Sequence, residues 1–211
     1  MRQLSRADQT IAAFAQRLAI IDGRGPAARR KYPADNPAVP ADADERRHAA
    51  GLMRVNHVGE ICAQALYDGQ TATARSERVQ ILMQQAAAEE LDHLDWTRRR
   101  IDELGERTSH LTGAFYLASF AAGATAGLLG DRVNLGFLAA TEEEVSAHLD
   151  RHLEALPASD VGSAAVIAQM REDEARHAQT AIRAGGAQFS RGLKRLMRGA
   201  SRIMTSLTYR F

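Results

Sequence analysis

The motif Glu-x-x-His occurs twice in the chain, as Glu90-Leu91-Asp92-His93 and as Glu174-Ala175-Arg176-His177. Residues three apart lie on the same face of an α-helix, so each copy presents one carboxylate and one imidazole to a common point. One such motif alone usually marks a solvated helix face, because short motifs often match by chance. Two copies in a helical chain instead predict a bundle in which both motifs face inward.

A lone glutamate precedes each motif at nearly the same distance along the chain. Glu60 lies thirty residues before Glu90, and Glu142 lies thirty-two residues before Glu174. Two lone glutamates and two Glu-x-x-His pairs, all projecting inward, are the ligand set of ferritin-like four-helix bundles that bind two iron or two manganese ions. The sequence therefore predicts an all-α, ferritin-like four-helix bundle. Its predicted metal ligands, which are also its predicted catalytic residues, are Glu60, Glu90, His93, Glu142, Glu174 and His177.

These residue types fit the charge of two metal ions. Two divalent ions a few ångströms apart repel each other, and four carboxylates neutralise that charge while some of them bridge the pair. Two imidazoles complete the coordination and leave positions open for oxygen. Carboxylate and imidazole ligands suit iron or manganese better than magnesium or a metal that prefers thiolates. We therefore predict two iron ions per chain, with O2 as co-substrate.

Glu142 stands in a run of three glutamates, and helical facing selects it as the ligand. Spacing alone favours Glu144, which lies thirty residues before Glu174. The helix face of Glu142, however, carries the apolar residues Leu135, Leu138, Val145 and Leu149. Glu144 shares its face with the polar residues His148 and Arg151. A glutamate on an apolar face needs a neutralising partner, and a metal ion provides one.

Other polar residues near the predicted ligands are candidates for supporting roles. Asp173 precedes the second motif and can accept the spare N–H of a ligating histidine, which fixes the tautomer of that histidine. His57 lies three residues before Glu60 on the same face, and His148 lies six residues after Glu142. Either histidine can relay protons or position substrate. A purely structural role is the more frequent one for both.

Helix-forming residues dominate the chain from about Asp44 onward. No stretch alternates apolar and polar residues as a half-buried strand would. We predict helices at about 45–75, 77–104, 111–129, 132–155, 160–184 and 188–208. Four of the five prolines lie between Pro26 and Pro40, where no helix can continue. The predicted organisation is an N-terminal helix at 1–22, a Pro- and Gly-rich linker at 23–44 and a metal-binding domain at 45–211.

The composition is that of an ordinary globular protein. Its 211 residues suffice for one domain, 45% of them are hydrophobic and 25% charged, and the formal net charge is +1. This charge does not indicate a nucleic-acid partner, and we predict none. The one cysteine, Cys62, excludes an internal disulfide and a cysteine-rich zinc or iron–sulfur site. We interpret Cys62 as a small buried residue. Tyr67, seven residues after Glu60, either lines the cavity of the site or belongs to the core, which is the more frequent place for an aromatic residue at that spacing.

Two segments indicate contact with a membrane. The first, Leu111 to Gly130, holds twenty residues without a charge and contains Gly123 and Gly127 in a GxxxG arrangement. It predicts a spanning helix, a helix in the membrane interface, or a helix buried against another subunit of a homo-oligomer. The second is the C-terminal tail, a basic amphipathic helix in which no acidic residue follows Glu174. Its apolar face carries Leu193, Leu196, Met197, Ala200, Ile203, Met204 and Leu207. The alternative for this tail is a helix packed on the bundle with its basic face in solvent.

Four stretches of the chain resemble the COQ7 (CLK-1) family of demethoxyubiquinone hydroxylases. They are Met53-Arg54-Val55-Asn56-His57-Val58-Gly59-Glu60, Glu90 with His93, Glu142-Glu143 with His148, and Asp173-Glu174 with His177. The resemblance implies the six ligands predicted above and a peripheral membrane monooxygenase of ubiquinone biosynthesis. Such an enzyme would use O2 to hydroxylate the ring of a 2-polyprenyl-3-methyl-6-methoxybenzoquinone or its quinol. The uncharged segment and the basic tail would hold the protein where a polyprenyl quinone resides.

Two alternatives to this function use the same metal ligands. An iron-storage or ferroxidase protein needs a soluble, cage-forming surface, which the uncharged segment and the basic tail oppose. Hydroxylation of another substrate, such as a tRNA base, would need a broad basic and aromatic surface. The sequence leaves the electron donor open. Its Ala- and Arg-rich composition, without a clear transit peptide, favours the cytoplasmic side of a bacterial inner membrane.

Overall fold

Long α-helices make up the chain, and the computed structural model contains no strand in the residues that it describes. Those residues are 15, 17–20, 22, 27–34 and 38–210. The helices are α2 (Ala43–Thr73), α3 (Glu77–Glu103), α4 (Thr112–Leu128), α5 (Asp131–Ala155), α6 (Val161–Arg183) and α7 (Arg191–Thr208). The ends of each helix lie within three residues of the predicted ends, so the all-α class is confirmed.

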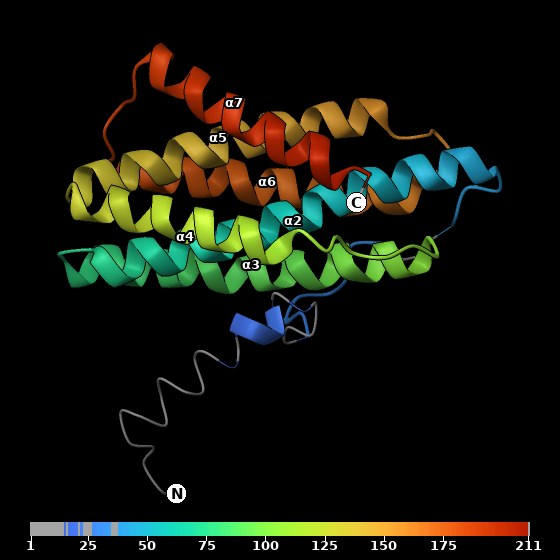
Figure 1. Ribbon diagram of the computed structural model, residues 1–211, viewed down its shortest axis with the longest axis horizontal. Helices are drawn as coiled ribbons and strands as arrows, with labels where there is room; N and C mark the ends of the chain where they lie inside the picture. Colours follow the sequence, from blue (N-terminus) through green and yellow to red (C-terminus); the bar gives the residue numbers. More distant parts are fainter. Residues whose placement is uncertain (1–14, 16, 21, 23–26, 35–37, 211) are drawn as a thin grey trace, which may run out of the picture.

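Four of these helices carry the predicted ligands, and they form two hairpins. α2 packs along α3, α5 packs along α6, and contacts between α3 and α6 join the two pairs (Figure 1). Only residues 74–76 connect α2 to α3, and residues 156–160 connect α5 to α6. α4 links the hairpins and packs mainly along α2, with a smaller contact to α5. Each hairpin therefore consists of one helix that carries a lone glutamate and one helix that carries the Glu-x-x-His motif.

Side-chain caps fix where the first hairpin begins and turns. The Asp42 carboxylate accepts hydrogen bonds from the backbone N–H groups of Asp44 and Glu45, both at 2.9 Å. The Ser76 side chain caps α3 in the same way by accepting from the N–H of Val79. Caps of this kind satisfy N–H groups that have no partner within the helix, and each contributes about 1 kcal/mol. These helix starts are therefore determined by local sequence.

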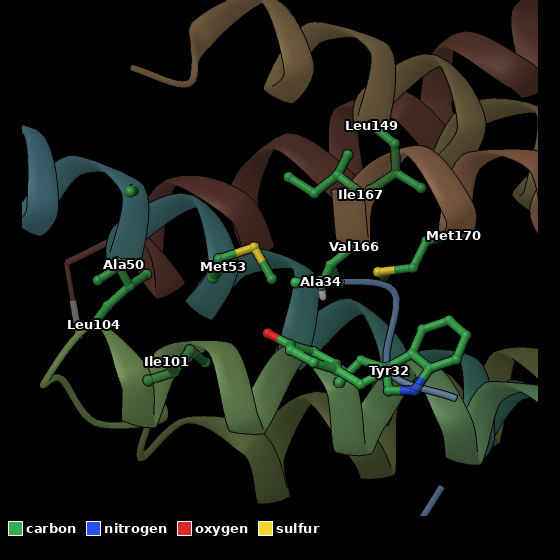
Figure 2. Close-up of a cluster of buried hydrophobic side chains, with 12 residues drawn as sticks. Tyr32, Ala34, Ala50, Met53, Ile101, Leu104, Leu149, Val166, Ile167 and Met170 are labelled. Carbon is green, nitrogen blue, oxygen red and sulfur yellow. The ribbon is translucent and has the colours of Figure 1, made fainter. Parts of the chain in front are cut away.

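Two apolar layers fill the bundle, one toward each end. The first layer consists of Tyr32, Ala34, Ala49, Ala50, Met53, Trp96, Ile101, Leu104, Leu149, Val166, Ile167 and Met170, and Figure 2 shows it. The second consists of Tyr67, Ala74, Val79, Met83, Ala86, Leu135, Leu138, Ala139 and Ala181. On each of the four helices, the predicted ligands lie in sequence between the residues of the two layers. The polar residues of the site therefore lie between the two apolar layers.

The segment before α2 packs into the first layer rather than lying apart from the bundle. It falls within the predicted linker, and residues 27–34 form no helix. Tyr32 is only 9% exposed and lies among side chains of α2, α3 and α6 (Figure 2). Its hydroxyl donates to Glu103 Oε2 at 3.0 Å, and the Arg99 guanidinium lies 4.1 Å above its ring. Of the predicted N-terminal helix at 1–22, residues 15 and 17–20 are helical, and the remainder lies outside the described residues except for Asp22.

The glycines of α4 serve a close contact with α2 of the same chain. A Cβ atom added to Gly123 would overlap the carbonyl oxygen of Leu66, and one added to Gly69 would overlap that of Phe120. The GxxxG pattern therefore serves a contact within the chain, whereas the sequence had left open a contact with another subunit. In the part of the chain that the structure describes, no helix is long and apolar enough to cross a membrane, so the spanning alternative for this segment is wrong.

We expect Gly123→Ala to lower the free energy of unfolding by about 1–3 kcal/mol, because the added methyl group meets backbone that can yield only by separating α4 from α2. Gly113→Ala on the same helix is the matched control, since nothing lies within 4 Å of an added Cβ there. That control should be neutral or stabilising by up to about 1 kcal/mol, because alanine is the better helix former. Urea unfolding followed by circular dichroism measures both, and equal effects would contradict the close contact.

Candidate metal centre

The six predicted ligands meet at the centre of the bundle. Glu60 comes from α2, Glu90 and His93 from α3, Glu142 from α5, and Glu174 and His177 from α6. They form two groups, and within each group the ligand atoms lie within 4.8 Å of one another. The first group is Glu60, Glu90, His93 and Glu174, and the second is Glu90, Glu142, Glu174 and His177. Glu90 and Glu174 belong to both groups, so they are placed to bridge two ions, with a lone glutamate and a histidine on either side.

All six side chains are buried, and none is more than 6% exposed. Moving a single carboxylate from water into a protein interior costs several kcal/mol unless a partner compensates its charge. Here four carboxyl groups share one interior site, so mutual repulsion adds to the cost of losing water. Protons or cations must therefore neutralise the site.

Each histidine directs Nδ1 into the cluster. His93 Nδ1 lies 2.9 Å from Glu90 Oε2, 3.1 Å from Glu174 Oε1 and 3.6 Å from Glu60 Oε2. His177 Nδ1 lies 3.1 Å from Glu90 Oε1 and 3.2 Å from Glu174 Oε2. A single N–H cannot donate to several acceptors at good angles, whereas a metal ion binds an imidazole nitrogen and several carboxylate oxygens at once.

Two carboxylate oxygens at the centre accept no hydrogen bond. They are Glu90 Oε1 and Glu174 Oε1, and each lies 3.1 Å from a histidine Nδ1 without meeting hydrogen-bond geometry. Buried acceptors without a donor are rare, because the unmet bond costs about 1–3 kcal/mol. Both oxygens belong to the glutamates that the two groups share, so ions bound between these glutamates would satisfy them. The donor set therefore fits a pair of divalent metal ions.

The acids of the cluster differ in how firmly they hold a proton. Burial, together with the neighbouring charge of Glu90, raises the pKa of Glu60 well above its ordinary value. Burial and the two shared glutamates raise the pKa of Glu142 in the same way. Burial would also raise the pKa of Glu90, but the two adjacent histidines hold it well below its ordinary value. The lone glutamates are thus the acids that favour protonation, and the shared Glu90 favours the charged form.

The surrounding carboxylates favour protonated histidines. Burial alone would lower the pKa of both imidazoles, but the charge of Glu90 and hydrogen bonds to neighbouring acids raise the pKa of His93 well above its ordinary value. The hydrogen bond with Glu174 and the adjacent carboxylate of Glu90 raise the pKa of His177 to about 11 in spite of its burial. A metal ion has to displace these protons, because an imidazole binds metal only through an unprotonated nitrogen.

The outer nitrogens of the histidines contact acids on the opposite motif. His93 Nε2 lies 2.9 Å from Asp173 Oδ2, and His177 Nε2 lies 3.3 Å from Glu89 Oε2. An acid at Nε2 fixes the tautomer in which Nδ1 is free to bind a metal. Asp173 and Glu89 occupy the same position, directly before the glutamate of each motif. Asp173 was predicted from the sequence and Glu89 was not, although the two motifs carry an acid at the same position.

Two further residues belong to the site. Tyr67, for which the sequence left open a place in the core or in the cavity, is 1% exposed, and its hydroxyl donates a hydrogen bond to Glu142 Oε1. Arg30 lies in the segment before α2 and binds both Asp92 and Asp173. No periodic pattern could have connected Arg30 to these acids, because the segment that carries it is not helical.

The glutamates beside Glu142 pair with α7 and not with the cluster. Glu143 pairs with Lys194 of α7 at 2.5 Å, and Glu144 pairs with Arg198 of α7 at 2.8 Å. Of the three consecutive glutamates, the structure therefore brings Glu142 to the cluster, as the facing argument predicted.

His57 and His148, which the sequence analysis proposed as supporting residues, belong to neither ligand group. His57 Nδ1 lies 3.1 Å from Thr97 Oγ1. The ring of His148 lies against that of His152, with ring centroids 3.9 Å apart. Burial lowers the pKa of both His57 and His148 to about 4, so both are neutral at physiological pH. A role in proton transfer for either histidine stays a prediction.

The helices and the buried cluster define an all-α protein with a candidate site for two metal ions, built from carboxylates and imidazoles. The profile of the family described as "Ubiquinone biosynthesis protein COQ7" matches residues 47–208. The chain therefore belongs to the COQ7 family, and the resemblance seen in the sequence is confirmed.

Several curated relatives, each named 3-demethoxyubiquinol 3-hydroxylase, are similar over most of their length. The relative from Chromohalobacter salexigens is 53% identical over 209 residues, which cover 99% of this chain and 98% of the relative. The relative from Azotobacter vinelandii is 55% identical over 174 residues, covering 82% and 81%. The relative from Burkholderia thailandensis is 47% identical over 206 residues, covering 96% and 98%.

We expect metal binding to release protons, because groups with raised pKa values must lose them to become ligands. Adding Mn²⁺ to the metal-free protein in weak buffer at neutral pH should release more than one proton per chain. The apparent affinity should rise with pH, since raising the pH removes the competing protons. A metal titration with a pH indicator measures both quantities. Glu143→Gln, at an exposed neighbouring position, should match the wild type, whereas metal uptake without proton release would contradict the raised pKa values.

Proposed function

We propose that this chain is a di-iron 3-demethoxyubiquinol 3-hydroxylase that acts in ubiquinone biosynthesis with O2 as co-substrate. The observation that carries the proposal is the pair of buried ligand groups that share two glutamates, each completed by a lone glutamate and a histidine. Such a set in an all-helical chain is typical of ferritin-like di-iron bundles. The substrate follows from membership of the COQ7 family and from the names of the similar relatives.

The proposed ligands divide evenly between two ions. Those of one ion are Glu60 and His93, those of the other are Glu142 and His177, and the shared ligands are Glu90 and Glu174. Two ferrous ions held in this way would supply electrons for the activation of O2. Carboxylates and imidazoles suit iron and manganese, and the oxygen chemistry of hydroxylation favours iron.

The protein around the ions keeps the ligands oriented and dry. Asp173 and Glu89 hold the Nε2 protons of the two histidines, so that each Nδ1 faces the metal position. Tyr67 donates to one oxygen of Glu142 and restrains that carboxylate. The apolar layers on either side of the cluster exclude water, which strengthens electrostatic interactions within the site.

We further propose that α7 binds the membrane surface where the polyprenyl substrate resides. Two residues of its basic side, Lys194 and Arg198, pair with glutamates of α5. Its apolar side turns outward, with Leu196 71% exposed and Ile203 63% exposed. Most of the apolar face is thus exposed, and only Met197 and Met204 at its edge are half-buried, in contrast to the alternative in which this face packs on the bundle. Exposed Arg195 and Arg202 add cations that suit anionic lipid headgroups.

α4 extends the proposed membrane surface. Leu117 is 71% exposed, and Leu128 and Leu129 at its C-terminal end are each 66% exposed. Both α4 and α7 contact α2 and α5, so the two helices lie on the same side of the bundle (Figure 1). The protein would thus be a peripheral protein of the cytoplasmic face of a bacterial inner membrane, with residues 45–211 as its metal-binding domain.

Anaerobic iron loading of the wild type, Glu142→Ala and Glu143→Ala tests the proposed activity. We expect two irons per chain in the wild type and in Glu143→Ala, whose side chain is exposed. Glu142→Ala should lose at least one iron, because a ligand that neutralises the ions is missing. O2, a reductant and a short-chain demethoxyubiquinol are then added. Mass spectrometry should show a product heavier by one oxygen, and the yield of this product should be at least about 100-fold lower in Glu142→Ala than in the wild type.

The outcomes of this experiment separate the alternatives. Two irons that oxidise without forming the hydroxylated product would favour a ferroxidase or another substrate. Wild-type protein that binds no stoichiometric iron would contradict the di-iron site itself.

Sedimentation with vesicles that contain phosphatidylglycerol tests the membrane surface. Leu196→Glu and Ile203→Glu should each weaken binding at least about tenfold, because burying a leucine-sized side chain contributes about 1.5–3 kcal/mol. Ile81→Glu is the matched control, since Ile81 is 45% exposed but lies on α3. If the wild type does not bind vesicles and instead forms dimers through this face, the surface is an interface between two copies of the chain and the membrane proposal is wrong.

A further inference from the structure

We infer that Arg30 is a positioning residue for the metal centre, acting through Asp173 on the orientation of His93. The inference rests on the metal site proposed above and extends it to a part of the chain before residues 47–208, the range that the family profile matches. It assigns a role to a segment that the sequence analysis interpreted as a linker.

The Arg30 side chain is held on several sides beside the cluster. Its Nε donates to Asp92 Oδ2 at 2.8 Å, and one terminal nitrogen donates to Asp173 Oδ2 at 2.7 Å. The other terminal nitrogen lies 3.2 Å from His93 Nε2. The guanidinium carbon lies 4.8 Å from the centre of the Trp96 ring. The planar, forked guanidinium makes these contacts at once, which the single ammonium of a lysine could not do.

The same carboxylate oxygen of Asp173 joins Arg30 to His93. Asp173 Oδ2 accepts from Arg30 at 2.7 Å and lies 2.9 Å from His93 Nε2. A guanidinium can only donate, so a proton on His93 Nε2 has Asp173 as its acceptor. Arg30 thus helps to determine which way this carboxylate faces, and the carboxylate in turn directs His93 Nδ1 at the metal position.

The backbone around Arg30 is fixed, so that the side chain is presented in one place. The N–H of Arg29 donates to Asp92 Oδ1 at 2.6 Å, and the N–H of Ala28 donates to Asp95 Oδ2 at 3.2 Å. Two residues after Arg30, Tyr32 is inserted into the first apolar layer (Figure 2). The segment is therefore bound to α3 by hydrogen bonds before Arg30, and after Arg30 it packs into the first apolar layer.

The two halves of the cluster differ in this support. The Asp173 side chain is fully buried, and Arg176 also binds it through its second oxygen at 2.7 Å. Glu89, the equivalent acid beside His177, is 39% exposed, and its cationic partner Arg176 is 52% exposed. In the other half, Arg176 binds Glu89 Oε2 at 2.6 Å, the oxygen that lies 3.3 Å from His177 Nε2, so the same arrangement there runs through an exposed carboxylate. Arg30 therefore supports the half that contains His93, and it does so through a carboxylate that is fully buried.

Charge and positioning predict opposite effects for the loss of Arg30. A positive charge close to the site repels a divalent ion, so its removal should strengthen metal binding if charge were all that mattered. Loss of a group that orients a ligand should instead weaken binding, and partners of metal-bound histidines typically contribute a factor of about 10–100 in affinity. The sign of the change therefore distinguishes the two roles.

Anaerobic Mn²⁺ and Fe²⁺ titrations by calorimetry on Arg30→Met, Arg30→Lys and Arg29→Met test the inference. Arg30→Met should weaken one of two binding steps about tenfold and leave the other unchanged. Arg30→Lys should fall between Arg30→Met and the wild type, because it keeps the charge without the fork. Arg29→Met removes the same charge from an exposed side chain and keeps the backbone bond, so it should match the wild type.

A double-mutant cycle with Asp173→Asn tests whether Arg30 acts on His93 through Asp173. If Arg30 acts through Asp173, Arg30→Met should change the affinity by less than about twofold in the Asp173→Asn background. Unchanged or stronger metal binding in Arg30→Met would overturn the inference, as would a lower unfolding temperature of the metal-free protein with wild-type affinity. Wild-type protein that binds no metal would instead contradict the proposed function.

Discussion

The structure depends on one electrostatic constraint, the enclosure of four carboxyl groups in an apolar interior. Without compensation, lost hydration and mutual repulsion would drive the helices apart. Two imidazoles offset part of this charge, and the raised pKa values of Glu60 and Glu142 show that protons offset more of it. Two oxygens, on Glu90 and Glu174, still accept no hydrogen bond. The apolar layers above and below the cluster provide the packing energy that holds this costly arrangement in place.

Contacts that cross between the motifs couple the two hairpins. The acid before each motif contacts the histidine of the other, so neither half of the cluster is complete until α3 and α6 have docked. The near-symmetry is broken by the segment before α2, which places Arg30 beside one half only. The repeated motif therefore produces two candidate metal positions with similar proposed ligands and different surroundings.

The outer helices connect this centre to its proposed substrate. Glycine contacts bring α4 close against α2, and ion pairs hold the basic side of α7 on α5. Both helices contact α2 and α5, and each exposes apolar side chains. In the proposed function, α4 and α7 would bind the membrane that holds the apolar tail of the substrate, and the four inner helices would hold the metal ions.

The sequence by itself determined the helices and the residues that meet at their centre. Caps, glycine stops and the three-residue spacing of Glu90 and His93 act within one helix, so they can be read without knowing how helices pack. Only the tertiary structure decided that Asp173 contacts His93 instead of His177 in its own motif. It also decided that Arg30 reaches the cluster and that α7 turns its apolar face outward. These features depend on how the hairpins dock and on the path of a non-helical segment, and no periodic pattern in the sequence encodes either.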